Sequence, residues 1–242
     1  FRSFYIIFAI IFAIVGLSSE FAIGRLAKTG TLGAYEYSFK TRKNNSKVGK
    51  YIGYIPLMGT FLIAIGYSVI VAYILKGFID SLTGEIFSST SQVWFDSFAS
   101  VPHSVIPYHA IIIIVTILTC FGGASSIEKT NKIMMPTFFV LFLILAIKVG
   151  SLPNSIEGYK NMFLYDPKTL NMKTILDSMG QAFFSLSITG SGMIVVGSYI
   201  SKDEDIVSSS IQTGIFDTLA GLISSFVIIP AVRVFAMKEV GG

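Results

Sequence analysis

Long apolar stretches recur along this chain of 242 residues, and they constrain its fold more than any other feature. A helix needs about 20 predominantly apolar residues to cross the hydrocarbon core of a bilayer. A mean hydropathy of +0.72, with 52% hydrophobic and 13% charged residues, is too apolar for an ordinary soluble domain. The sequence predicts an all-α integral membrane protein with six transmembrane spans, of which the third is short: 5–23, 54–79, 108–120, 134–149, 179–200 and 211–232.

The placement of charged and reactive residues excludes several function classes. The net charge is +4, but the basic residues lie between the apolar stretches rather than on one aromatic-studded face, which argues against nucleic-acid binding. No glycine-rich phosphate loop or hydrolase motif occurs, so we expect neither an enzyme nor an organic cofactor. His103 and His109 have no carboxylate or cysteine nearby, which favours interfacial side chains over a metal site. Cys120, the single cysteine, is expected to be a small buried hydrophobe.

The distribution of positive charge predicts the orientation in the membrane. Residues 24–50 carry seven Lys and Arg residues, whereas residues 77–122 carry none. Because cytoplasmic loops carry the excess of Lys and Arg, we expect residues 24–50 inside and the aromatic segment 80–107, with a short interfacial helix, outside. The first span then runs from outside to inside, which predicts a further helix before it. We therefore expect residues 1–242 to form a single but incomplete transmembrane domain of the cell membrane.

The fifth apolar stretch contains an unusual polar segment, Ser-Ile-Thr-Gly-Ser-Gly at residues 187–192. Irregular backbone at membrane depth is tolerated only where it lines a cavity or is buried in protein. A break there would produce two half-helices whose ends can hold ions and charged groups. The alternative is a continuous helix whose small residues allow a neighbouring helix to approach closely. The pattern alone leaves both interpretations open.

Charged side chains within the apolar stretches favour the first interpretation. Asp217 lies inside a span, where an unpaired carboxylate costs a few kcal/mol or more, and an intramembrane acid is by default a functional residue. Glu20 and Arg25 lie near the cytoplasmic end of the first span, where a structural role is favoured. Tyr67 taken alone predicts only a buried hydrogen bond within the bundle.

Five segments in order resemble the neurotransmitter:sodium symporter family, of the bacterial amino-acid transporter type. They are SSEFAIGRLAKTG, GYSVIVAYILKGF, SSIEKTNKIMMP, GQAFFSLSITGSGMIVVGSYISKDEDIV and FDTLAGLISSFVIIPAV, and together they cover nearly the whole chain. They resemble the family's second, third, fifth, sixth and seventh helices. The resemblance implies a partial LeuT-type fold with a discontinuous helix near 187–192, covering helices two to seven. It also implies sodium-driven uptake of an amino acid by alternating access.

The same resemblance implies roles for individual residues. Tyr67 matches the tyrosine that binds the substrate carboxylate, Phe184 the aromatic lid, and Ile63 a residue of the side-chain pocket. Glu20 matches the acid that steadies the broken helix, and with Arg25 forms a structural or gating pair. The implied sets are Ile63, Tyr67, Phe184, Ser185, Ser187 and Gly190 for substrate, Ser185 and Asp217 for sodium, and Tyr5, Gln181, Ser185, Asp217 and Gly221 for the equivalent of a chloride site.

Three departures from the family pattern affect what the resemblance implies. Gly190 replaces a bulky residue beside the substrate and Thr189 replaces a common glycine, so the pattern does not identify the substrate. Asp217 stands where many members have asparagine, which predicts transport without chloride. The expected partners are an amino-acid substrate and the lipid bilayer, and no nucleic acid. The alternative function is a non-transporting sensor or structural remnant that retains the same scaffold.

Overall fold

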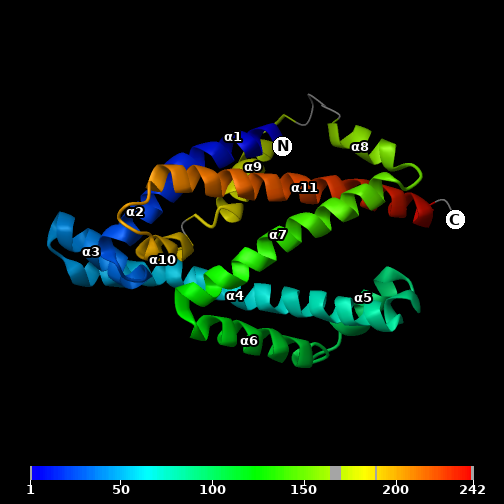
Figure 1. The fold of residues 1–242 in the computed structure, drawn as a ribbon, viewed down its shortest axis with the longest axis horizontal. Coiled ribbons are helices and arrows are strands. Elements are labelled where there is room, and N and C mark those ends of the chain that lie inside the picture. Colours follow the sequence, from blue (N-terminus) through cyan, green and yellow to red (C-terminus); the bar gives the residue numbers. More distant parts are fainter. Residues whose placement is uncertain (1, 164–169, 189, 241–242) are drawn as a thin grey trace. The chain divides into compact units, whose positions relative to one another are not determined.

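The computed structural model describes residues 2–163, 170–188 and 190–240, and every regular element in these ranges is helical (Figure 1). The all-α prediction is therefore confirmed. In chain order the elements are α1 (Arg2–Phe12), η1 (Ala13–Leu17), α2 (Ser18–Ala27), α3 (Thr31–Lys43), α4 (Ser46–Thr83), η2 (Glu85–Phe87), α5 (Ser91–Ala99), α6 (Ile106–Phe121), α7 (Gly123–Gly150), α8 (Ser155–Phe163), α9 (Met172–Ser185), α10 (Gly192–Tyr199) and α11 (Ile206–Val240).

Among the described residues, four helical stretches are long and apolar enough to cross a membrane: Ser3–Ala27, Ser46–Thr83, Gly123–Gly150 and Ile206–Val234. They contain the first, second, fourth and sixth predicted spans. The third is α6, which is short and apolar with 16 residues. The fifth is divided between α9 and α10. Residues 125–132, which precede the fourth predicted span, form the first turns of α7 rather than a separate loop.

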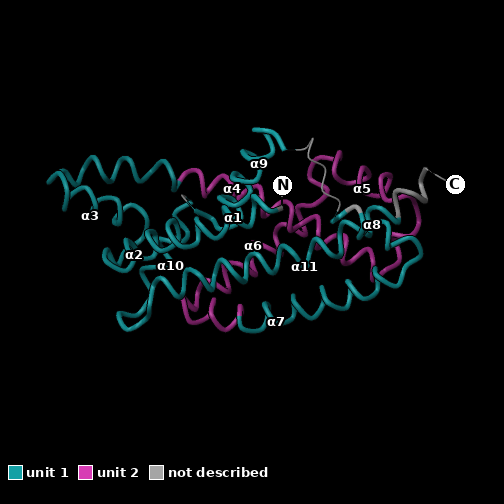
Figure 2. The backbone as a smooth tube through the Cα atoms, turned by 90° about the horizontal axis from the view of Figure 1, so that it is seen from above, with its two compact units in different colours: residues 1–57, 132–242 teal, residues 58–131 magenta. Residues whose placement is uncertain are grey.

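The chain divides into two compact units (Figure 2). The first unit comprises residues 1–57 and 132–242, and the second comprises residues 58–131. Helices α4 and α7 contribute to both units. The first unit holds α1–α3 and α8–α11, and the second holds α5, α6 and most of α4.

The core of the first unit lies where a π-helical turn meets the end of α9. The turn η1 interrupts the first long helix, and its residues Ala13 and Leu17 are buried together with Leu186 and Ile188. Gly16, within the turn, leaves room for the Ile188 side chain, which an added Cβ would approach to 2.8 Å. Such π-helical turns are frequent at functional sites, and this one faces the polar segment after α9.

Two facing glycines bring α2 and α10 into close contact in the first unit. A Cβ atom at Gly24 would collide with the carbonyl oxygen of Ile194, and one at Gly197 would lie 2.7 Å from the carbonyl oxygen of Phe21. Because both obstacles are backbone atoms, a side chain at either position would force the two helices apart. Figure 1 shows α2 and α10 side by side at the same end of this unit.

Cations from the end of α2 bind the backbone of the last turn of α10 and of the segment that follows it. Arg25 donates hydrogen bonds to the carbonyl oxygens of Ser201 at 3.2 Å and Glu204 at 2.7 Å. Lys28 donates to the carbonyl oxygens of Ser198 at 3.3 Å and Ile200 at 3.0 Å. Arg25 and Lys28 therefore stabilise the negative end of α10 and fix the turn that leads into α11.

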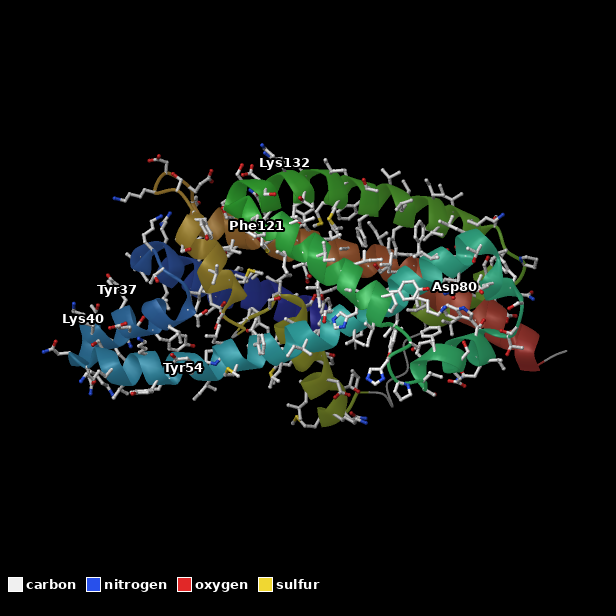
Figure 3. All side chains as sticks on the ribbon, turned by 90° about the horizontal axis from the view of Figure 1, so that it is seen from below. Tyr37, Lys40, Tyr54, Asp80, Phe121 and Lys132 are labelled. Carbon is white, nitrogen blue, oxygen red and sulfur yellow. The ribbon has the colours of Figure 1, made fainter. Side chains whose placement is uncertain are left out.

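A buried ion pair attaches α5 to the end of α4 in the second unit. Lys76 Nζ lies 2.7 Å from Asp80 Oδ2, and the indole nitrogen of Trp94 donates to the same oxygen at 2.8 Å. Asp80 is only 2% exposed, and Lys76 lies over the ring of Phe98 at 5.1 Å. Figure 3 shows Asp80 at this end of α4. The helix expected within residues 80–107 is α5, while its interfacial position stays a prediction.

A second polar contact joins α4 and α6. The hydroxyl of Ser68 lies 2.8 Å from Nε2 of His109, close to the beginning of α6. At the other end of α6, Cys120 is exposed, so the prediction of a buried cysteine was wrong. An apolar run in a membrane helix can face lipid instead of protein, and apolarity alone does not distinguish the two environments.

Candidate functional site

The helix that begins at Met172 breaks within the polar segment. The amide of Leu186 still donates to the carbonyl of Ala182, but Ser187 donates three residues back, to Phe184, at 3.1 Å. Ser187 and Ser191 adopt left-handed φ angles of 54° and 65°, and α10 begins at Gly192. The predicted discontinuity is confirmed, and the alternative of a continuous helix is wrong. Thr189 lies outside the described residues.

Three polar side chains from different helices meet at this break. Ser185 is the last residue of α9, and its hydroxyl donates to the two carboxylate oxygens of Asp217 at 2.7 and 2.8 Å. The hydroxyl of Tyr5, on α1, lies 3.2 Å from Asp217 Oδ2 and 3.3 Å from Ser185 Oγ. Gly221 follows Asp217 by one turn of α11, and its ideal Cβ position lies 4.0 Å from the Tyr5 hydroxyl. We call Tyr5, Ser185 and Asp217 the hydroxyl–carboxylate cluster.

The cluster has a negative charge that the described protein residues do not neutralise. Both contacts to Asp217 come from neutral hydroxyl groups, and no described Lys, Arg or His side chain forms an ion pair with it. The end of α9 at Ser185 adds the negative end of a helix dipole. Hydroxyl and carboxylate oxygens are the ligands that hard cations prefer. The donor set therefore fits a small hard cation.

The described residues contain no group of three or more His, Cys, Asp and Glu side chains that could hold a metal ion. Sites rich in thiolate or imidazole ligands suit transition metals, whereas the cluster offers only oxygen. With one carboxylate, its charge suits a single positive charge.

A cavity of about 750 Å³ in the first unit reaches the cluster. Ser185 and Asp217 contribute to its lining, together with Phe139 of α7 and Met193 of α10. One face of α11 continues the lining with Ser209, Gln212, Thr213 and Phe216, which recur at the spacing of a helical face. Sequence reasoning missed Gln212 and Thr213, although the three- and four-residue spacing before Asp217 was a signal that could have identified them.

The other predicted residues near the break differ in their exposure. Phe184 is 51% exposed and Ser187 is exposed, while Gly190 is half-buried. Gln181 lies one turn before Ser185 on α9 and is exposed, and among the described residues no hydrogen bond links it to the cluster. The predicted anion-site set therefore comes together only in part.

Ile63 and Tyr67, the other predicted substrate residues, belong to the second unit. Both lie on α4 with side chains about half-exposed, at 48% and 47%. Glu20 is half-buried on α2, close enough to Tyr35 of α3 to influence its titration. Burial and, to a smaller extent, the negative charge of Glu20 raise the pKa of the Tyr35 phenol above its ordinary value.

Comparisons with known proteins agree with this geometry. The model of the sodium:neurotransmitter symporter family matches residues 95–241. An uncharacterized sodium-dependent transporter of Bacillus subtilis, YhdH, is 28% identical over 98% of this chain and 53% of its own length. Another uncharacterized sodium-dependent transporter, from Haemophilus influenzae, is 25% identical over 99% of this chain and 55% of its own length.

A solved structure is also similar. The crystal structure of MhsT in complex with L-phenylalanine superposes with a TM-score of 0.83 at 30% identity, covering 99% of this chain and 54% of that one. The chain thus spans about half the length of the relatives that it matches.

Proposed function

Because the chain belongs to the sodium:neurotransmitter symporter family and is a multi-pass membrane protein, we propose that it forms part of a sodium-coupled amino-acid symporter. In this proposal the whole transporter carries its substrate across the cell membrane by alternating access around a site at the broken helix. Residues 1–242 supply one portion of that site, and helices outside this range complete it.

The observation that carries the proposal is the hydroxyl–carboxylate cluster at the end of α9. Its uncompensated negative charge and hard oxygen atoms suit sodium as the co-transported ion, with Ser185 and Asp217 as ligands. Sodium bound there offsets the negative charge of Asp217, and this charge in turn favours binding of the ion. The names of the similar sodium-dependent transporters support the same ion.

The roles proposed for the substrate residues rest on the resemblance of the sequence to this family. In this proposal Tyr67 binds the carboxylate of the amino acid and Ile63 contributes to the pocket for its side chain. Phe184 covers the substrate from the α9 side, and the turn at Ser187 and Gly190 borders it. Glu20 and Arg25 hold α2 against the broken helix, consistent with the hydrogen bonds that Arg25 makes after α10.

Transport independent of chloride follows from the identity of residue 217. Moving sodium into a site of low dielectric leaves a positive charge that requires a compensating anion. Asp217 provides this anion permanently, beside Tyr5, Ser185 and Gly221. A chloride ion bound next to the carboxylate would be repelled by it.

The test is sodium-dependent uptake by the whole transporter with chloride replaced by gluconate. We expect the wild type to transport equally in both media, because Asp217 already supplies the negative charge. Asp217→Asn should transport poorly in gluconate and recover in chloride. A wild-type transporter that stops without chloride would contradict the assignment of the anion, whereas uptake that ignores sodium would contradict the ion coupling itself.

We further propose a large apolar or aromatic amino acid as the substrate. Gly190 has no side chain to occupy the compartment beside the turn, which leaves it roomy unless Met193 or Thr189 folds into it. The solved relative MhsT was crystallised with L-phenylalanine, which supports this substrate class. In competition assays, Gly190→Ala and then Gly190→Phe should progressively exclude tryptophan and phenylalanine while sparing alanine. Equal losses for all three amino acids would show that Gly190 does not border the side chain.

A further inference from the structure

A second cavity, of about 540 Å³, lies in the first unit between the end of α2 and α3. Its lining combines apolar side chains with two cations: Ile23 and Leu26 from α2, and Tyr37, Phe39, Arg42 and Lys43 from α3. Ile23 and Leu26 belong to the last turns of the membrane-spanning stretch Ser3–Ala27. The cavity therefore lies at the end of a span, where hydrocarbon gives way to headgroups.

Helix α3 is held firmly enough to maintain this cavity. It packs against the beginning of α4 through two glycines that allow close approach. A Cβ at Gly49 would lie 2.7 Å from the Cβ of Phe39, and one at Gly53 would lie 3.2 Å from the Cβ of Tyr35. This packing fixes the rotation of α3, so the arrangement of Arg42 and Lys43 beside the α2 side chains does not depend on a ligand.

The segment around the cavity has a strong excess of positive charge. Residues 31–50 contain Lys40, Arg42, Lys43, Lys47 and Lys50, all exposed, against one acidic residue, Glu36. In the part of the chain that the structure describes, none of these five cations takes part in an ion pair. Figure 3 shows Tyr37 and Lys40 along α3. An aromatic and apolar wall thus continues into an unpaired basic patch.

The helix dipole accounts for only part of this pattern. Lys40, Arg42 and Lys43 occupy the last turn of α3, where cations stabilise the negative end of a helix. That effect needs no cavity and no apolar wall beside the cations. Arginine binds phosphate oxygens in a bidentate manner, and basic pockets between membrane helices bind the headgroups of anionic lipids.

We propose that the cavity between α2 and α3 binds one anionic phospholipid from the cytoplasmic leaflet. Its phosphate lies at Arg42 and Lys43, and the beginning of its acyl chains lies along Ile23, Leu26 and Phe39. A soluble phosphate would satisfy only the cations and would leave the apolar wall unmatched. The proposal is independent of the transported substrate, because it uses none of the residues assigned to the transport site.

The test measures lipid retention by the whole transporter with native mass spectrometry after titration with phosphatidylglycerol or phosphatidylcholine. We expect the wild type to retain one phosphatidylglycerol in preference to phosphatidylcholine. The variant Arg42→Gln/Lys43→Gln should lose that preference, with affinity for phosphatidylglycerol falling about tenfold or more. The matched control Lys47→Gln/Lys50→Gln removes the same charge from the same segment but from outside the cavity. It should change the affinity about twofold or less.

Several outcomes would overturn the proposal. Equal losses in the two double variants would show diffuse attraction to a charged surface instead of a site. Displacement of phosphatidylglycerol by inorganic phosphate alone would point to a soluble anion. Where Arg42→Gln/Lys43→Gln fails to fold, photoactivatable phosphatidylglycerol on the unmodified transporter provides the measurement. Cross-links must then fall within residues 23–43, and cross-links confined to other segments would contradict the site.

Discussion

The contact between Ser68 and His109 indicates which ring nitrogen of His109 carries the proton. The Ser68 hydroxyl lies 2.7 Å from the carbonyl oxygen of Ile65, which can only accept a hydrogen bond. Its one hydrogen is therefore used there, and the 2.8 Å contact to His109 Nε2 requires histidine to be the donor. The geometry assigns the proton of neutral His109 to Nε2. Because Tyr67 immediately precedes Ser68, this bond also fixes the turn of α4 that carries Tyr67, the tyrosine proposed to bind the substrate.

We predict that ¹⁵N NMR of histidine-labelled transporter will show His109 with its proton on Nε2. His109→Leu should weaken the contact between α4 and α6 by about 1 kcal/mol and raise the KM for substrate more than it lowers kcat. His109→Gln, which retains a donor near the Nε2 position, should restore the wild-type KM. His103→Asn serves as the control, since His103 is exposed with a left-handed φ of 69° that asparagine tolerates. A proton on Nδ1 would exclude the assigned bond.

At the residue scale, sequence reasoning identified the members of the site that are costly to place in a membrane. Asp217 was recognisable because a carboxylate within an apolar stretch is costly in a membrane and is by default functional. The resemblance added Tyr5 and Ser185. Gln212 and Thr213 were missed because neutral polar residues are common in membrane helices. The pairing of Ser68 with His109 could not be predicted, since it depends on how α4 and α6 are rotated.

Helix packing in the first unit depends on the contact between Gly24 and Gly197. An added methyl group at Gly24 meets the backbone of α10, which cannot move aside as a side chain could. We predict that Gly24→Ala will lower the free energy of unfolding of the detergent-solubilised transporter by about 1 to 3 kcal/mol, seen as a lower Tm. Gly59→Ala is the matched control in α4, where no described atom lies within 4 Å of the new Cβ apart from the adjoining residues and backbone of its own helix. It should leave the Tm unchanged or raise it, because alanine favours helix by about 0.5 to 1 kcal/mol. Equal effects of the two substitutions would contradict the close packing of α2 on α10.

The attachment of α5 to α4 makes a separate prediction in the second unit. Asp80→Asn removes the negative charge that faces Lys76 and accepts from Trp94, in a place that is almost fully buried. Breaking a buried pair on one side costs about 3 to 5 kcal/mol. We therefore expect α5 to detach, with faster amide hydrogen exchange across Ser91–Ala99 and little change in α10. Asp96→Asn, on the exposed side of α5 beside Gln92, should leave the exchange rates unchanged. Unaltered exchange in Asp80→Asn would show that aromatic packing alone holds α5.

At the scale of elements, the sequence predicted the features that depend on the length and apolarity of a segment. Six apolar segments were recognisable from their length and composition. The pattern at 187–192 left a break and a continuous helix open, and Asp217 and the family resemblance favoured the break. The π-helical turn η1 was not predicted, since AIVGL differs little in composition from its flanks and its contact with Ile188 joins residues far apart in the sequence. The start of α7 within a polar segment was also missed, because polar residues at a helix end are equally compatible with a loop.

For the whole molecule, the cluster at the break offers fewer oxygen ligands than a hard cation usually takes. Hard cations take about six oxygen ligands or more, whereas Tyr5, Ser185 and Asp217 supply only four side-chain oxygens. A cavity of about 750 Å³ lies beside them. The relatives that share this fold are about twice as long as the matched region. If the cluster binds sodium as proposed, the ligands that these three residues do not supply come from elsewhere in the transporter.

We therefore predict that liposomes containing only residues 1–242 will show no sodium-dependent amino-acid uptake, whereas liposomes containing the whole transporter will. The physical reason is the incomplete coordination of sodium, which leaves the cost of desolvating the ion without sufficient compensation. Protease protection of the basic segment 40–50 should confirm that the shorter protein has inserted, so that inactivity is not mistaken for failed reconstitution. Co-reconstitution with a polypeptide carrying the missing helices should restore uptake, because the cluster itself is already formed. Sodium-driven uptake by residues 1–242 alone, abolished by Asp217→Asn, would show instead that this half of the scaffold holds a complete ion site.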